Sequence, residues 1–210
     1  MKFLSVLAAL VPLAAGQAPP SLVPILNTDP AFRAWALYAH NVDRALHGVP
    51  PLVWHDNLSN YAQQWANQCV WAHSNGMYGE NLHGLWIRTP LDFINQTRSG
   101  IHDGWYKEID LYDYNKPGFA AATGHFTQVV WKNTTYVGCA WNTTPCKSGV
   151  WNWFELVCEY WPAGNVLNDA IFRANVPPPL VKQVTNPVLG AVGSIVNGVG
   201  GAVGSLIGGG

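Results

Sequence analysis

The stretch GHFTQVVW (residues 124–131) places one histidine, His125, at the head of an apolar run. Three further imidazole or carboxylate groups lie in short motifs of their own: CVWAHS (residues 69–74), GENL (79–82) and WYKE (105–108). Two imidazoles and two carboxylates are the groups that a divalent-metal site or an acid–base site requires. The candidate site residues are therefore His73, Glu80, Glu108 and His125.

The first residues have the features of a secretory signal peptide spanning residues 1–16. Lys2 supplies a positive start, residues 3–11 form a short apolar segment, and residues 13–16 are small enough for cleavage. An oxidising compartment suits the four cysteines, Cys69, Cys139, Cys146 and Cys158, whose spacing matches no zinc-finger pattern. We expect two disulfides, and the sequence alone permits three pairings.

Composition excludes some classes of function. The net charge of −1 lacks the excess of positive charge that is typical of nucleic-acid-binding proteins. Residues 3–11 are too short to span a membrane as a helix, and glycine dilutes the apolar C-terminal residues, so an integral membrane protein is not expected. Four Asn-x-Ser/Thr sequons are candidates for N-glycosylation: Asn57, Asn95, Asn133 and Asn142.

Periodicity predicts helices interleaved with strands. Asp29-Pro30 is a start signal for a helix that ends near Gly48, and apolar spacing predicts a second helix over residues 58–69. Thr89-Pro90 marks a third start, and Ile101, Trp105 and Ile109 mark a fourth helix. Residues 136–141 and 151–160 are expected to be strands. This order favours an α+β sandwich.

The chain divides into a mobile lead-in over residues 17–30, one folded domain over residues 31–168, and a C-terminal extension. That extension, residues 169–210, breaks at Pro177-Pro178-Pro179 and becomes a Gly/Val-rich tail. The tail is expected to be disordered, with a membrane-seeking segment or an anchor signal as alternatives.

Four motifs in this order resemble the CAP superfamily of cysteine-rich secretory, antigen-five and pathogenesis-related-one proteins. They are HNVDR (40–44), GENL (79–82), GHFTQVVW (124–131) and CEYWPAGN (158–165). The loop YDYNKPGF (112–119) and the stretch WKNTT (131–135) are most similar to fungal secreted members. The resemblance covers about residues 31–168.

The resemblance implies a three-layer α-β-α sandwich with a central cleft, in which His73, Glu80, Glu108 and His125 form a tetrad. That tetrad would bind a divalent ion, zinc or magnesium, weakly; the alternative is a hydrogen-bonded polar cluster that stabilises the core. The family pattern also implies the disulfides Cys139–Cys158 and Cys69–Cys146. A structural role is expected for three residues of the first helix, His40, Asn41 and Arg44.

Three functions follow from the resemblance. In the first, the aromatic loop residues Tyr112, Tyr114, Pro117 and Phe119 open an apolar slot for a sterol or a fatty acid, as is associated with fungal relatives. The alternative for this loop is that its aromatic rings fold back onto the core.

The second function is a secreted module that acts on a host or cell-wall partner. The third is a metal-assisted hydrolase, such as a protease, in which the two histidines and two glutamates supply a Lewis-acid site and a general base. Ser74 could be invoked as its nucleophile, but no nucleophile-elbow or zinc-protease motif supports this function. We expect a non-enzymatic, extracellular, lipid-binding protein, with association with the cell wall as an option.

Overall fold

The computed structural model describes residues 24–87, 89–148 and 151–180. Two units are distinguished, residues 1–178 and 179–210, and only two residues of the second are described. The expected signal peptide over residues 1–16, the first part of the lead-in and most of the Gly/Val-rich tail lie outside the described residues.

The described elements alternate between helices and strands. In chain order they are α1 (Pro30–Leu46), β1 (Val53–Trp54), α2 (Asp56–Ala66), β2 (Gly79–Ile87), α3 (Phe93–Ser99), a π-helical turn (Gly100–Trp105), a 3-10 helix (Tyr106–Leu111), α4 (Gly124–Val129), β3 (Tyr136–Trp141), β4 (Cys146–Ser148), β5 (Trp151–Trp161) and α5 (Asp169–Asn175).

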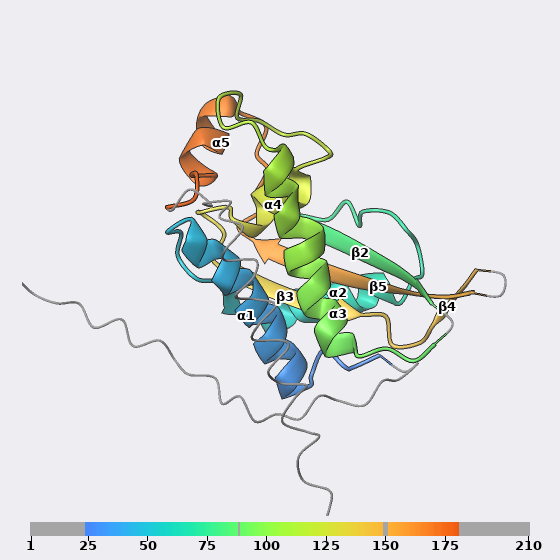
Figure 1. Ribbon diagram of the computed structural model, residues 1–210. Coiled ribbons are helices and arrows are strands. Elements are labelled where there is room, and N and C mark those ends of the chain that lie inside the picture. The colour runs from blue at the N-terminus through green and yellow to red at the C-terminus, as the bar shows by residue number, and fades with distance from the viewer. Residues whose placement is uncertain (1–23, 88, 149–150, 181–210) are drawn as a thin grey trace, which may run out of the picture. The chain divides into compact units, whose positions relative to one another are not determined.

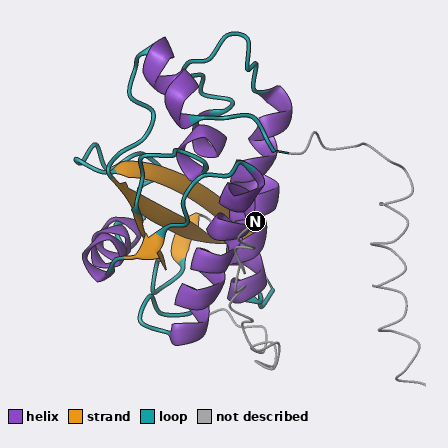
Figure 2. Ribbon diagram, turned by 90° about the vertical axis from the view of Figure 1, so that its left-hand side faces the viewer, coloured by secondary structure: helices purple, strands orange, loops and turns teal. Residues whose placement is uncertain are grey.

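The strands form one sheet in the order β1-β3-β5-β2, with β4 paired to β5. β1 runs parallel to β3, whereas β2, β3 and β4 are antiparallel to β5. Helix α2 covers one face, and α1, α3 and α4 lie on the other (Figure 1). Figure 2 shows the three layers edge-on, with a single helix on one side of the sheet. The predicted α+β sandwich is confirmed.

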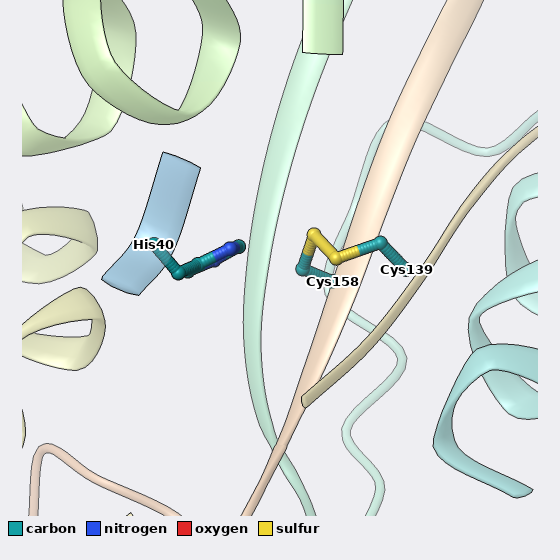
Figure 3. Close-up of side chains that lie close together, drawn as sticks. All are labelled: His40, Cys139 and Cys158. Carbon is teal, nitrogen blue, oxygen red and sulfur yellow. A yellow bond between two sulfur atoms is a disulfide. The ribbon is translucent and has the colours of Figure 1, made fainter. Parts of the chain in front are cut away.

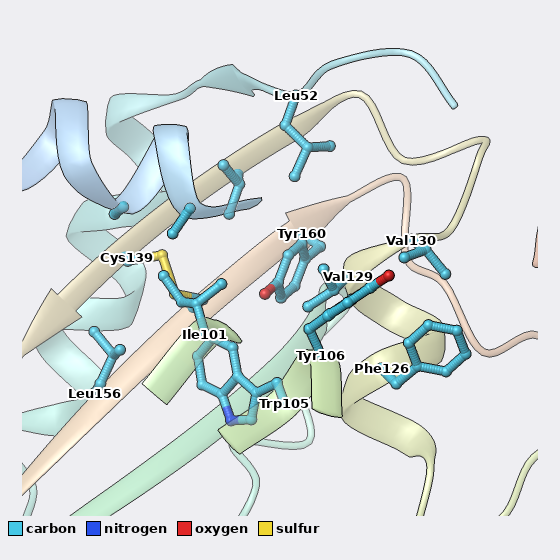
Figure 4. Close-up of a cluster of buried hydrophobic side chains, with 14 of the residues drawn as sticks. Leu52, Ile101, Trp105, Tyr106, Phe126, Val129, Val130, Cys139, Leu156 and Tyr160 are labelled. Atoms are coloured by element: carbon cyan, nitrogen blue, oxygen red, sulfur yellow. A yellow bond between two sulfur atoms is a disulfide. The ribbon is translucent and has the colours of Figure 1, made fainter. Parts of the chain in front are cut away.

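The main hydrophobic core lies between the sheet and the layer of α1, α3 and α4. Trp105, Tyr106, Phe126 and Tyr160 are among the large side chains that fill it (Figure 4). The core on the α2 side is thinner and is built from small or aliphatic residues: Ala62, Ala66, Leu82, Ala140 and Val157. The large rings therefore stabilise mainly the first interface.

Helix α1 begins and ends where its sequence signals predict. Asp29 Oδ1 accepts hydrogen bonds from the backbone N–H groups of Ala31 (2.7 Å) and Phe32 (3.3 Å), and Pro30 is the first helical residue. Gly48 follows the helix with a φ of 64°, a conformation that glycine adopts without strain.

Two other helix boundaries differ from the prediction. Helix α2 ends at Ala66, and Cys69 lies beyond it with a φ of 56°, so this cysteine is not helical. Helix α3 begins at Phe93, because Asp92 rather than Thr89 accepts the hydrogen bonds of the first free N–H groups, those of Ile94 and Asn95.

The folded unit extends beyond both predicted boundaries. At its start, Asn27 is buried and donates to the Ser59 hydroxyl (3.0 Å), so the described part of the lead-in is fixed to α2. At its end, Phe172 of α5 is fully buried against Trp131, with ring centroids 5.0 Å apart. The boundary predicted at residue 168 was therefore wrong, since the unit continues to Pro178.

Both predicted disulfides are present. Cys139–Cys158 joins β3 to β5 at directly opposed positions, and Cys69–Cys146 ties the segment after α2 to β4.

Candidate functional site

The tetrad consists of two histidine–glutamate pairs. In the first pair, Glu108 Oε1 accepts from His125 Nδ1 at 2.6 Å. Glu108 Oε2 accepts from the backbone N–H groups of His125 (3.0 Å) and Phe126 (3.1 Å) at the start of α4. Thr123, which precedes α4, makes no side-chain cap. Glu108 thus caps α4 from the 3-10 helix and fixes the ring of His125.

In the second pair, Glu80 Oε1 accepts from His73 Nδ1 at 2.6 Å and from the backbone N–H of Ser74 at 3.0 Å. Burial opposes ionisation of Glu80, but hydrogen bonds from His73, Glu159 and Ser74 outweigh it and lower its pKa. The hydrogen bond to Glu80 in turn raises the pKa of His73. The His73 side chain is 58% exposed, so its second nitrogen is open to a ligand.

Asn81 of β2 connects the two pairs. Its Nδ2 donates to the backbone carbonyl of His125 (3.2 Å) and to the Tyr160 hydroxyl (3.3 Å). Because consecutive strand residues face opposite sides of a sheet, Glu80 and Asn81 point to different layers. Within the part of the chain that the structure describes, no three tetrad residues bring ligand atoms within 4.8 Å of one another. The tetrad is therefore organised as two pairs rather than as a closed metal cage.

Only one trio of potential ligands meets that distance among the described residues: His40, Cys139 and Cys158 (Figure 3). The two sulfur atoms are bonded to each other, so neither is a thiolate that can bind a metal. His40 Nδ1 donates to the Ala36 carbonyl and its Nε2 accepts from the Tyr160 hydroxyl, each at 2.7 Å. Burial lowers the pKa of His40 to about 4, so the ring is neutral and structural.

Asn41 and Arg44 also have the structural roles predicted from the sequence. Asn41 exchanges two hydrogen bonds with the backbone of Leu52, which fixes the chain after α1. Arg44 is fully buried and donates to four backbone carbonyls between 2.8 and 3.0 Å, those of Pro50, Val129, Trp131 and Thr134.

The aromatic loop is partly folded onto the core. Tyr112 is only 9% exposed and packs against Phe126, and Tyr114 meets the Tyr112 ring edge-on at 4.9 Å. Pro117 is buried, whereas Phe119 is 52% exposed. The Tyr114 hydroxyl is buried and has no hydrogen-bond partner among the described residues. The loop thus combines the exposed ring of Phe119 with two buried hydroxyl groups, those of Tyr112 and Tyr114, that have no hydrogen-bond partner among the described residues.

Several buried polar residues were missed by sequence reasoning. Glu155 and Glu159 are fully buried on β5, and Glu159 lies directly opposite Glu80 of β2. The period-2 spacing of these acids along a strand was a signal that they share one face. His47 is buried and donates to the Pro177 carbonyl, and His102 Nδ1 lies 2.7 Å from Oδ1 of buried Asp43.

The four sequons differ in exposure. Asn57, Asn95 and Asn133 are exposed, as a glycan requires. Asn142 is fully buried, and its side chain accepts from the Glu155 N–H and donates to the Thr144 carbonyl. Asn142 is therefore not available for a glycan in the folded protein.

Comparison with known proteins agrees with the family motifs and the fold. The model of the cysteine-rich secretory protein family, CAP, matches residues 37–160. This chain belongs to the CAP family. "Repressed by EFG1 protein 1" of Candida albicans is 42% identical over 73% of this CAP chain and 56% of its own length. The chain thus spans little more than half of that relative.

Two further comparisons extend the CAP assignment. Golgi-associated plant pathogenesis-related protein 1 of Homo sapiens is 40% identical over 70% of this chain and 94% of its own. The crystal structure of NaASP2 with Zn²⁺ has a TM-score of 0.56 at 22% identity, covering 74% of this chain and 92% of that one. The latter likeness supports the CAP fold. Among the described residues, no helix is long and apolar enough to cross a membrane.

Proposed function

We propose that this CAP protein is secreted and binds small hydrophobic lipids, with sterols as the first candidates and fatty acids as the second. Two observations on the same loop carry the proposal: the Tyr114 hydroxyl is buried without a hydrogen-bond partner among the described residues, and the Phe119 ring is exposed. A buried hydroxyl without a partner costs free energy, which a ligand hydroxyl can recover. A sterol supplies one hydroxyl together with an apolar ring system that suits Phe119.

The tetrad is proposed as a weak divalent-ion site. The Nδ1 atoms of His73 and His125 each form a hydrogen bond with a glutamate carboxylate. A metal-binding imidazole commonly has this arrangement, in which its other nitrogen, Nε2, binds the metal. His73 and His125 would therefore hold the ion. Zinc suits imidazole nitrogen better than magnesium does, since magnesium prefers oxygen ligands. The bound ion would supply positive charge close to both pairs.

Zinc titration calorimetry tests the metal proposal. The double variant His73→Ala plus His125→Ala is expected to lose most of the zinc affinity of the wild type. His55→Ala is a matched control, because this histidine belongs to neither pair. Equal zinc affinity in the wild type and the double variant would remove the tetrad as a metal site.

We further propose that the protein acts by binding and not by turnover. Ser74 Oγ accepts from the Gly76 N–H (3.3 Å), and no described hydrogen bond joins it to an imidazole. A serine nucleophile needs such a base within hydrogen-bond reach. This arrangement argues against the hydrolase alternative.

A secreted module that acts on a host or cell-wall partner remains the second candidate, favoured by the two disulfides and the exposed sequons.

A titration of radiolabelled cholesterol, with fatty acid as competitor, tests the lipid proposal. Phe119→Ser is expected to weaken binding by roughly tenfold or more, because it removes an apolar ring contact. Tyr114→Phe removes only the hydroxyl and should weaken binding by about two- to tenfold. Tyr112 is unsuitable for this test, since it belongs to the core.

Leu111→Ser is the matched control, because Leu111 is 68% exposed next to the loop but lies outside it. Wild-type affinity in Phe119→Ser would show that the loop is not the binding site. If the folded, disulfide-intact protein fails to bind either lipid, the carrier proposal is wrong and the interaction module becomes the better candidate.

A further inference from the structure

A pocket of about 260 Å³ lies at the N-terminal end of α2, away from the aromatic loop. It is lined by His55, Asn57 and Leu58 at the entry to α2, by Met77 and Tyr78 before β2, and by Trp161 at the end of β5. Pockets for drug-sized ligands are usually 300–1,000 Å³. This pocket is therefore suited to a group about the size of a single ring.

Aromatic rings form part of the wall of this pocket, and its lining includes no carboxylate, lysine or arginine. The rings of Tyr78 and Trp161 meet edge-on with centroids 6.1 Å apart, and Tyr78 packs in turn on Tyr61 of α2. Trp161 and Met77 remain 44% and 71% exposed, which is unusual for such large apolar side chains. The Nδ1 atom of His55 has no hydrogen-bond partner among the described residues. The pocket thus combines an exposed aromatic ring, that of Trp161, with a polar atom, His55 Nδ1, that is available for a hydrogen bond.

The pocket contains the acceptor residue of a sequon. Asn57 is exposed in the first turn of α2 and is followed by Leu58 and Ser59, so a glycan attached to it begins at the pocket. Ser59 is fully buried and donates to the Cys139 carbonyl (3.0 Å). The glycosyltransferase that recognises Ser59 as part of the sequon must therefore act before α2 packs on the sheet.

A pyranose ring matches the chemistry of the pocket. Its C–H face is apolar and packs on aromatic rings, while its rim of hydroxyl and acetamido groups forms hydrogen bonds. We propose that Asn57 carries an N-linked glycan whose first N-acetylglucosamine ring packs in this pocket against Trp161 and Tyr78. Glycosylation of Asn57 requires passage through the secretory pathway, but it does not depend on lipid or metal binding.

The test uses the full chain secreted from a eukaryotic host. Glycopeptide mass spectrometry measures the occupancy of each sequon, and timed digestion of the native protein with a peptide N-glycosidase measures release of each glycan. Release at Asn57 is expected to be roughly tenfold slower than at Asn95 or Asn133, because a packed first sugar must leave the pocket before cleavage. Asn95 and Asn133 are matched controls, since both are exposed but neither lines the pocket.

Variants of the pocket wall separate ring packing from general crowding. Trp161→Ala is expected to raise release at Asn57 to the rate of the control sites, and Trp161→Phe to keep most of the protection. If Trp161→Ala is not secreted, Met77→Ser tests the same pocket at a more exposed position. Trp86→Ala, which changes a similarly exposed indole outside the pocket, should alter nothing. An unoccupied Asn57, or equal release at all three sites, would overturn the proposal.

Discussion

The carboxyl groups of Glu155 and Glu159 are buried on the side of the sheet that α2 covers. Burial raises the pKa of Glu155 to about 8 and that of Glu159 to about 10, with the charge of Glu80 adding to both shifts. Both groups are therefore protonated at neutral pH, and Glu159 lies directly opposite Glu80 of β2. The protonated Glu159 thus lies next to the ionised Glu80, whose carboxylate positions His73.

These two carboxyl groups predict a loss of stability at alkaline pH. Their pKa values are raised in the folded state, so their contribution to stability is complete below about pH 4.5 and is lost as pH rises toward 8 and 10. Glu159→Gln, which cannot ionise, should reduce this loss by more than about 1 kcal/mol between pH 5 and 9. Urea unfolding at both pH values measures it, and parallel curves for variant and wild type would contradict the assignment.

Arg44 predicts a second effect of a single residue. Lysine cannot donate to four carbonyls in the geometry of a guanidinium, so Arg44→Lys leaves buried acceptors unpaired. We expect the free energy of unfolding to fall by about 2–4 kcal/mol. Arg98→Lys is the control, because Arg98 is exposed and the change there should cost under about 0.5 kcal/mol. A similar small cost at Arg44 would show that its hydrogen bonds contribute little.

At the scale of elements, α5 is part of the folded unit although it follows the last family motif. Phe172 fills a space beside Trp131, and the Asn175 carbonyl accepts from the Lys132 N–H at 2.9 Å. Phe172→Ala should therefore destabilise the protein by about 3–5 kcal/mol through the cavity it leaves. Ile171→Ala, on the exposed side of the same helix, should cost far less in thermal unfolding. Equal costs would mean that α5 does not stabilise the domain.

The elements with strong local signals could be predicted, and the others depend on tertiary contacts. Asp29-Pro30 and Gly48 fix α1, and the β-rich stretches fix β3 and β5. Strand β2 was missed, because Gly84 and the polar start of Gly79–Ile87 interrupt the alternation of an ordinary strand. Gly84 packs closely against an aromatic ring: a Cβ there would lie 2.8 Å from Trp71, which would have to shift. Such a contact cannot be read from the neighbouring sequence.

The candidate site was likewise predictable only where local sequence motifs specify it. Its four residues could be proposed because each lies in a short motif of its own, whereas the disulfide pairing followed only from the family resemblance. The alternation along β5 indicates that Glu155, Val157 and Glu159 share a face, but not that both acids are buried or that one meets Glu80. The burial of Tyr112 agrees with the alternative in which the loop's rings fold back onto the core, but its contact with Phe126 of α4 depends on tertiary structure.

For the whole molecule, the two disulfides differ in access to solvent. Cys69 is exposed although its partner Cys146 is buried, whereas both Cys139 and Cys158 are fully buried in the core. A mild thiol reductant should therefore open Cys69–Cys146 at least about tenfold faster, because exchange requires access to sulfur. Alkylation followed by peptide mass mapping measures the order. Earlier labelling of Cys139 and Cys158 would show that the core opens before the surface bridge.

Loss of the Cys69–Cys146 bridge should lower stability without unfolding the sheet. It closes a loop of 77 residues, for which chain entropy gives about 4 kcal/mol. The double variant Cys69→Ser plus Cys146→Ser is thus expected to unfold at lower urea concentration while it keeps its strand signal in circular dichroism. An unchanged urea midpoint would mean that the bridge does not stabilise the fold.

The contact between α2 and β3 depends on the absence of side chains. A Cβ on Gly138 would lie 2.1 Å from the backbone nitrogen of Ser59, and the residues that continue this interface, Ala62, Ala66 and Ala140, are buried and small. Side chains of this size lose almost no rotamer freedom on burial. Assembly of this layer therefore carries a small entropic penalty, but even one added methyl group has no free volume to enter. The segment that leads from α2 to His73 is held at its origin by this close approach of two backbones.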